Sequence, residues 1–176
     1  MLAGMTKRIA TALGCGVLLA VTAYGATAQA AVVRGDDNDN VLRGTARADS
    51  IRAFAGNDRL YGLQGPDTMA GGTDDDKVKG GPGADVLNGQ DGNDRINTGH
   101  DDQADFVHGG AGNDVIFMTG NDTAFGDTGD DKFFASYAGD GMEIQCGAGE
   151  DTVIFNQPSP GAKRKDCEHV KVIPAG

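Results

Sequence analysis

Between about Gly35 and Ile154 the chain repeats a unit of nine residues with one apolar residue in a fixed place. From Gly44 the units read GTARADSIR, AFAGNDRLY, GLQGPDTMA, GGTDDDKVK, GGPGADVLN and GQDGNDRIN. The last three residues of each unit alternate outward, inward and outward, which predicts a short β-strand with one buried side chain. The predicted inward residues are Ile51, Leu60, Met69, Val78, Leu87, Ile96, Val107, Ile116, Phe125, Phe133, Met142 and Val153.

The first six residues of each unit are rich in glycine and predict a tight turn, because glycine tolerates positive φ. A turn with a three-residue strand cannot bury a core alone, so the units must stack. Two units per coil place one apolar column between two small parallel sheets. The sequence therefore predicts an all-β solenoid, and its 29 glycines argue against a helical bundle because glycine destabilises a helix interior by about 1 kcal/mol.

Three units depart from the period of nine. TGHDDQADFVH (98–108) and ASYAGDGMEIQ (135–145) are longer, and MTGNDTAF (118–125) is shorter. We expect them to break the stacking phase and to weaken any site that spans them. At the start of the repeats, Asn40 stands in the usual place of Asp and Arg47 in a usual place of glycine.

The chain is strongly acidic, and its acidic and basic residues occupy different places in the repeat. The chain has 26 acidic and 15 basic residues, a formal net charge of −11, which argues against binding nucleic acid, whose phosphates require a basic surface. Within the repeats only Arg47 enters a turn. The other cations flank the inward residue and should point outward from the strands: Arg43, Arg52, Arg59, Lys77, Lys79, Arg95 and Lys132.

The turns are instead crowded with Asp, above all at the sixth place of the unit. Stacked coils lie about 4.8 Å apart, so these carboxylates form rows of like charge that oppose folding unless a cation neutralises them. Ca²⁺ takes six to eight oxygen ligands from carboxylates and carbonyls, whereas Zn²⁺ prefers His and Cys. An isolated Gly-Asp turn is commonly ordinary solvated turn chemistry, but its recurrence every nine residues predicts a calcium-binding protein.

These units resemble the RTX nonapeptide repeat, G-G-x-G-x-D-x-U-x, most closely in GGPGADVLN and GGAGNDVIF. The resemblance covers residues 35–154, and the chain is similar to small secreted actinobacterial calcium-binding proteins of this repeat type. The resemblance implies a right-handed parallel β-roll loaded with several Ca²⁺ ions. It implies metal-binding carboxylates at Asp49, Asp58, Asp67, Asp76, Asp85, Asp94, Asp105, Asp114, Asp131 and Asp151. It also implies carbonyl ligands in the turns, for example at Gly80, Gly81, Gly83, Gly109, Gly110 and Gly112.

The two ends of the chain differ from the repeats. Basic residues, an uncharged apolar run and Ala28-Gln29-Ala30 predict a cleaved signal peptide over 1–30, with a membrane anchor as the alternative. The mature chain is then secreted, without a membrane span, and comprises the repeats (31–154) and a C-terminal cap (155–176). Its two cysteines, Cys146 and Cys167, predict a disulfide, with two free thiols as the alternative.

Catalysis has little support in the sequence. His100, His108 and His169 belong to no recognisable catalytic motif, and we predict no enzyme activity. Two functions remain open: a protein whose activity is calcium binding, and an extracellular structural or adhesive protein that uses calcium only as a stabiliser. Phe106, Phe117, Phe134 and Tyr61, predicted to point outward, are candidates for a partner surface.

Overall fold

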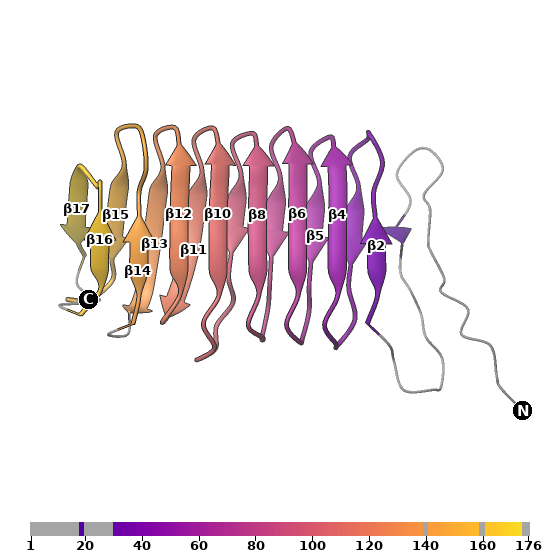
Figure 1. Cartoon of the computed structure of the whole chain (residues 1–176), viewed down its shortest axis with the longest axis horizontal. Helices are drawn as coiled ribbons and strands as arrows, with labels where there is room; N and C mark the ends of the chain where they lie inside the picture. Colours follow the sequence, from indigo (N-terminus) through magenta and orange to yellow (C-terminus); the bar gives the residue numbers. More distant parts are fainter. Residues whose placement is uncertain (1–17, 20–29, 139–140, 159–160, 174–176) are drawn as a thin grey trace, which may run out of the picture.

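The chain forms a flattened coil whose straight segments make two parallel β-sheets (Figure 1). The structure is a computed structural model that describes residues 18–19, 30–138, 141–158 and 161–173. Except for Leu18–Leu19 and Ala30, the predicted signal peptide (1–30) lies outside the described residues. No helix long and apolar enough to cross a membrane occurs in the described part of the chain.

We call the two sheets the even sheet and the odd sheet, after the numbers of their strands. The even sheet contains β2 (Val32–Arg34), β4 (Ser50–Ala55), β6 (Thr68–Thr73), β8 (Val86–Asp91), β10 (Phe106–Ala111), β12 (Thr123–Thr128), β14 (Glu143–Gln145) and β16 (Lys163–Lys165). The odd sheet contains β1 (Leu18–Leu19), β3 (Val41–Arg43), β5 (Arg59–Tyr61), β7 (Lys77–Lys79), β9 (Arg95–Asn97), β11 (Val115–Gly120), β13 (Lys132–Ala138), β15 (Thr152–Phe155) and β17 (His169–Val172).

Each strand pairs in parallel with the strand one coil away in the same sheet. Met69 of β6 is opposite Leu87 of β8, and Leu60 of β5 is opposite Val78 of β7. Both pairs are separated by two nine-residue units, so the predicted arrangement of two repeats per coil is confirmed. The parallel β-solenoid has about eight turns.

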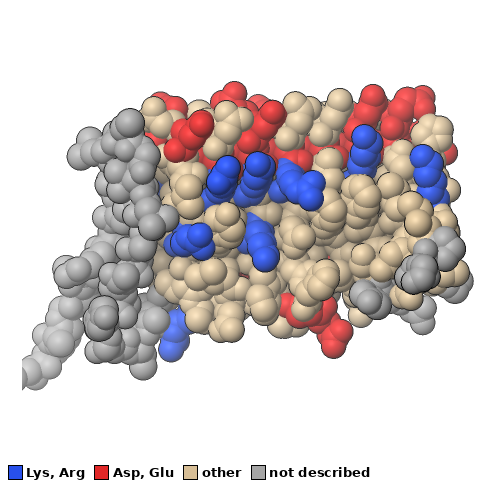
Figure 2. Space-filling model, turned by 180° about the vertical axis from the view of Figure 1, so that it is seen from behind, with Lys and Arg blue, Asp and Glu red and all other residues tan. Residues whose placement is uncertain are grey.

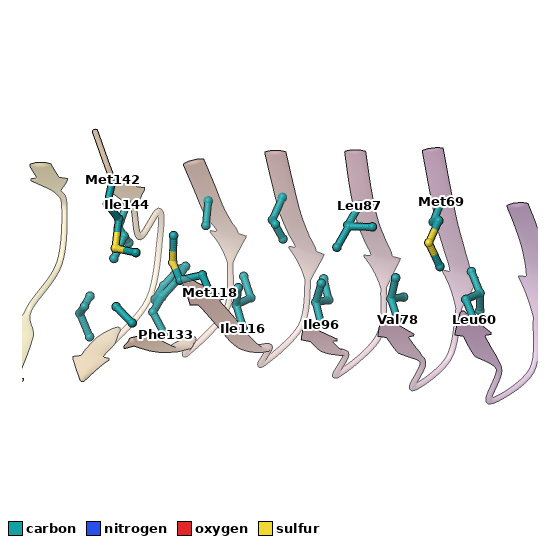
Figure 3. Packing of buried hydrophobic residues seen from close by; sticks show 14 of the residues in the cluster. Leu60, Met69, Val78, Leu87, Ile96, Ile116, Met118, Phe133, Met142 and Ile144 are labelled. Atoms are coloured by element: carbon teal, nitrogen blue, oxygen red, sulfur yellow. The ribbon is translucent and has the colours of Figure 1, made fainter. Parts of the chain in front are cut away.

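The core is a single apolar column between the sheets, and Figure 3 shows its side chains pointing toward one another from both sides. Most predicted inward residues are buried there, including Leu60, Leu87 and Ile96. One prediction was wrong, because Ala124 rather than Phe125 points inward from β12. Met142 is buried in the core as predicted, although it lies just before β14, where Ile144 is also inward.

The irregular units leave the stacking in place, contrary to our expectation, and shift the register only locally, between Thr119 and Gly120 where β11 pairs with β13. Phe106 of β10 is opposite Val86 of β8 and Thr123 of β12, the same alignment as in the regular coils. The extra residues of the unit 98–108 lie in the turn between β9 and β10. A turn at the edge can change length without disturbing strand pairing, because the ladder hydrogen bonds involve only the strands.

The last coil extends both sheets and is tied to the preceding coil. β16 pairs with β14, and β17 pairs with β15. Cys146 and Cys167 form a disulfide with their Cα atoms 5.2 Å apart, which confirms the predicted bridge. It joins the turn after β14 to the segment that leads into β17.

Candidate metal centres along the two edges of the coil

The sixth-place Asp residues are gathered into two rows, one along each edge of the flattened coil. The upper edge, at the top of Figure 1, is formed by the turns that lead into the odd strands, and the lower edge by the turns that lead into the even strands. The upper row contains Asp58, Asp76, Asp94, Asp114, Asp131 and Asp151. The lower row contains Asp49, Asp67, Asp85, Asp105 and Asp122.

All of these carboxylates are buried, with at most 5% of any residue exposed. The ten predicted Asp residues therefore lie in equivalent places, and the structure adds Asp122, which the sequence analysis missed. Its local sequence, Gly120-Asn121-Asp122, matches the Gly-Asn-Asp of the regular repeats. This local match could have identified Asp122. The unit 118–125 has only eight residues, however, so Asp122 does not follow the preceding sixth-place Asp at an interval of nine.

Within each row, one carboxylate oxygen is held by the backbone of the preceding coil. The Asp67 N–H donates to Asp85 Oδ1 at 2.8 Å, and the Asp94 N–H donates to Asp114 Oδ1 at 2.8 Å. The upper row ends where the Asp151 N–H donates to Glu168 Oε2 at 3.0 Å. The lower row ends at Asp122, which accepts from the backbone at both of its carboxylate oxygens.

The second carboxylate oxygen is the unusual one. In eight of the eleven Asp residues, Oδ2 is buried and has no hydrogen-bond donor among the described residues. A buried acceptor without a partner costs about 1–3 kcal/mol, and more when it carries charge. These atoms are therefore suited to a cation: Asp58, Asp67, Asp76, Asp85, Asp94, Asp114, Asp131 and Asp151.

Six of these eight oxygens lie in a small cradle that exists because the first residue of their unit is glycine, whereas Ala53 and Cys146 occupy that place in the units of Asp58 and Asp151. A Cβ atom on Gly80 would lie 2.3 Å from Asp85 Oδ2 and 2.6 Å from the Thr98 carbonyl oxygen of the next coil. A Cβ atom on Gly109 would lie 2.3 Å from Asp114 Oδ2 and 2.8 Å from the Gly126 carbonyl oxygen. At these six glycines a larger residue would fill a space that is lined by oxygen atoms.

Further carbonyl oxygens face the neighbouring turn at the second and fourth places. A Cβ atom on Gly99 would lie 2.3 Å from the carbonyl oxygen of Gly81, and one on Gly129 would lie 2.0 Å from that of Gly112. Gly83 and Gly110 belong to the same kind of turn, with φ of +150° and +122°. The predicted carbonyl donors thus lie in turns that place main-chain oxygens between successive coils.

Burial and mutual repulsion make the carboxylates reluctant to ionise without a cation. Burial, reinforced by neighbouring Asp charges and opposed by the backbone hydrogen bond, raises the pKa of Asp94 and Asp114 to about 7. Burial likewise raises the pKa of Asp58, Asp67, Asp105 and Asp131 to about 7, and that of Asp76 and Asp85 to about 6. A bound cation would reverse this preference by stabilising the charged form.

The chemistry of the donors narrows the choice of metal. Among the described residues, no three His, Cys, Asp or Glu side chains come together in one cluster. An ion between two coils must therefore combine carboxylate oxygens with main-chain carbonyls. An all-oxygen set with flexible geometry suits Ca²⁺ and not Zn²⁺.

Comparison with known families agrees with this assignment. The RTX calcium-binding nonapeptide repeat matches four consecutive stretches, residues 34–69, 70–100, 101–117 and 118–136. No individual curated protein matches the chain. Repeats of this family bind several Ca²⁺ ions in a β-roll, are typically non-enzymatic and typically occur in extracellular proteins. The matched stretches cover more than half of the sequence, and the chain therefore belongs to the RTX calcium-binding nonapeptide repeat family.

Proposed function

We propose that this chain is a secreted calcium-binding protein in which ion uptake between stacked coils drives folding. The observation that carries the proposal is the set of eight buried Oδ2 atoms without a donor. Without cations, each folded edge brings ionised carboxylates together in a buried environment, which opposes folding. With calcium, the same carboxylates hold adjacent coils together, so binding energy becomes folding energy.

The carboxylates proposed as ligands are the ten predicted from the repeat, and they are not equivalent. Asp85 and Asp94 lie in the middle of their rows, each with an unpartnered Oδ2 and an Asp on either side. Asp49 accepts hydrogen bonds from both the backbone and the hydroxyl of Thr45, so its carboxylate has less need of an ion. We expect the middle of the repeat region to bind calcium most strongly.

The test is a calcium titration of the metal-free chain, followed by circular dichroism with the bound ions counted. We expect little β-structure at first and a cooperative gain near 10⁻⁴–10⁻³ M, the usual range for extracellular calcium modules. Mg²⁺ should substitute poorly, because it requires a tighter octahedral site. A metal-free chain with the full β spectrum and an unchanged melting temperature would contradict the proposal.

Secretion is the second part of the proposal. It is supported by the basic and apolar pattern of residues 1–30 with its Ala-x-Ala ending and by the disulfide, since disulfides persist in oxidising compartments. Extracellular calcium is abundant, so a protein that folds only when loaded would complete its folding after export.

A further inference from the structure

Five cations form two rows on the outer face of the odd sheet, within the four successive strands β3, β5, β7 and β9. Arg59, Lys77 and Arg95 are aligned on adjacent strands, and a second row contains Arg43 and Lys79 with Tyr61 between them. Figure 2 shows this face, with Lys and Arg gathered below an acidic upper edge. We call these five cations and Tyr61 the basic face.

The basic face is not neutralised by the protein itself. The outward residues of β3, β5, β7 and β9 include no acid. None of the five cations is in an ion pair with a carboxylate of the described residues. Like charges on adjacent strands, about 4.8 Å apart, repel one another and weaken a sheet. The repulsion among these cations is therefore offset only at a distance, by the acidic edges of the coil, and the cations are available to pair with an external anion.

The second row also borders a hollow of about 340 Å³. Its walls combine Arg43 and Lys79 with Tyr61, the exposed Leu63 and the turn 80–82. The Arg43 guanidinium carbon lies 4.3 Å from the centre of the Tyr61 ring, and that of Arg95 lies 4.2 Å from the centre of the Phe117 ring. These contacts hold the guanidinium groups in place, and a fixed guanidinium recognises carboxylates well because it can donate two parallel hydrogen bonds.

We propose that the basic face binds a linear acidic polysaccharide, a glycan whose sugars carry carboxylates. An extended polymer lying along the coil axis can place its carboxylates over the row of aligned cations, with one sugar ring in the hollow beside Tyr61. Such a site would explain an adhesive role, and none of its five cations is among the residues proposed to bind calcium.

The charge distribution favours a glycan over a nucleic acid. A duplex or single strand carries dense phosphate charge, which the acidic upper edge next to the basic face would repel. A polysaccharide with sparser carboxylates needs only a narrow cationic strip. Calcium on the edges should strengthen glycan binding further, because it lowers the negative potential beside the strip.

The experiment measures binding of the calcium-loaded chain to a hyaluronan fragment by titration calorimetry, with dextran of equal length as the neutral control. The test variant is Arg59→Ser, Lys77→Ser and Arg95→Ser combined. The matched control is Lys163→Ser, Lys165→Ser and Lys171→Ser combined, which removes the same charge outside the basic face. A second variant, Arg43→Ser with Lys79→Ser, removes the cations beside the hollow.

We expect the unmodified chain to bind hyaluronan and not dextran, with affinity that falls as salt increases. Both basic-face variants should bind about tenfold more weakly, while the matched control should bind as the unmodified chain does. Circular dichroism in calcium checks that each variant is folded.

The proposal is overturned if hyaluronan does not bind, if dextran binds equally well, or if the matched control loses as much affinity as the test variants. It is also overturned if single-stranded DNA of equal charge binds more tightly than the glycan fragment. Because the readout is glycan affinity, it is separate from calcium-induced folding, and either proposal can fail without the other.

Discussion

At the scale of single residues, Asp94 shows how one carboxylate can both oppose and support the same fold. Its Oδ1 accepts the Asp76 N–H at 2.8 Å, while its Oδ2 is buried without a donor. In the absence of calcium, the ionised carboxylate is held in an unfavourable place. In its presence, the same oxygen becomes a ligand. The sign of its contribution to stability therefore depends on the ion.

The effect of Asp94→Asn on stability should have opposite signs in excess calcium and in chelator. The Asn side chain keeps the acceptor for the Asp76 N–H, but it has no charge and cannot give a second oxygen to a cation. We expect a loss of about 1–3 kcal/mol of stability in excess calcium. In chelator we expect a gain of at least about 1 kcal/mol, because one buried charge is removed. Thermal unfolding measures the loss in excess calcium. The concentration of a stabilising osmolyte that is needed to fold the chain measures the gain in chelator.

The matched control is Asp91→Asn, three residues earlier. Asp91 is exposed, and its carboxylate makes no hydrogen bond or ion pair with the described residues, yet its substitution changes the net charge equally. It should have little effect in either condition. Equal effects of the two substitutions would show that general charge, and not a buried ligand, controls stability.

The places of the ten predicted carboxylates in the two rows could be predicted from sequence, because a stacked fold repeats one residue environment at a fixed spacing. Spacing could not identify Asp122, because its own unit, 118–125, has one residue fewer before the Asp than the regular units have. The same shift led to Phe125 being predicted inward, whereas its ring stacks on His108 with ring centroids 4.8 Å apart. The Nδ1 atom of that histidine lies 2.7 Å from Asp127 Oδ2, a contact between coils that no local motif indicates.

At the scale of elements, the turns of the upper edge are joined by a second ladder, formed by side chains at the fifth place of the unit. The Asn113 N–H donates to Asn93 Oδ1 at 2.9 Å, and the Asp130 N–H donates to Asn113 Oδ1 at 2.8 Å. The lower edge has Ala48, Pro66, Ala84 and Ala104 in this place, which have no side-chain acceptor. Its last turn has Asn121, whose Oδ1 accepts the Gly141 N–H at 3.2 Å. The strands were predictable from hydrophobic alternation, but this difference between edges emerged only once alternate turns were assigned to opposite edges.

Asn113→Ala should weaken the upper edge without affecting calcium directly. The substitution removes the acceptor for the Asp130 N–H, so we expect a loss of about 0.5–1.5 kcal/mol. Denaturant unfolding in excess calcium measures this loss, and the calcium midpoint per site should change little. Asn88→Ala on the outer face of β8 is the control, since Asn88 makes no hydrogen bond with the described residues. A similar loss at Asn88 would mean that the ladder adds no stability of its own.

At the scale of the whole molecule, the buried carboxylates predict an unusual dependence on pH. Their pKa values in the folded state, about 6 to 7 where values are given above, exceed the unfolded value near 3.9. Groups with a raised folded pKa contribute stability that is fully present below the unfolded pKa and is lost as pH rises through the folded pKa. The metal-free fold should therefore be more stable at pH 5 than at pH 8.

Circular dichroism of dialysed, metal-free protein at the two pH values tests this directly. A gain of structure at pH 5 is expected from protonation of the buried rows, whose pKa values are raised. With calcium present the dependence should reverse, because protons compete with the ion for the same oxygens, and the calcium midpoint should rise on acidification. A metal-free chain equally unfolded at both pH values would count against buried, proton-binding carboxylates.

The two edges are not linked equally. The upper edge, which we call the spine, has more contacts between coils than the lower edge, which we call the open side. Along the spine, carboxylate and amide side chains at two places in most turns connect the coils, and the disulfide secures the last one. Along the open side, the row is shorter, its final carboxylate is already satisfied by backbone donors, and the turn after β9 is lengthened. When calcium becomes scarce, adjacent coils should separate first along the open side and stay joined along the spine. The earliest calcium-poor form is then a half-opened molecule that exposes its apolar column along one side, and such a form would be prone to self-association.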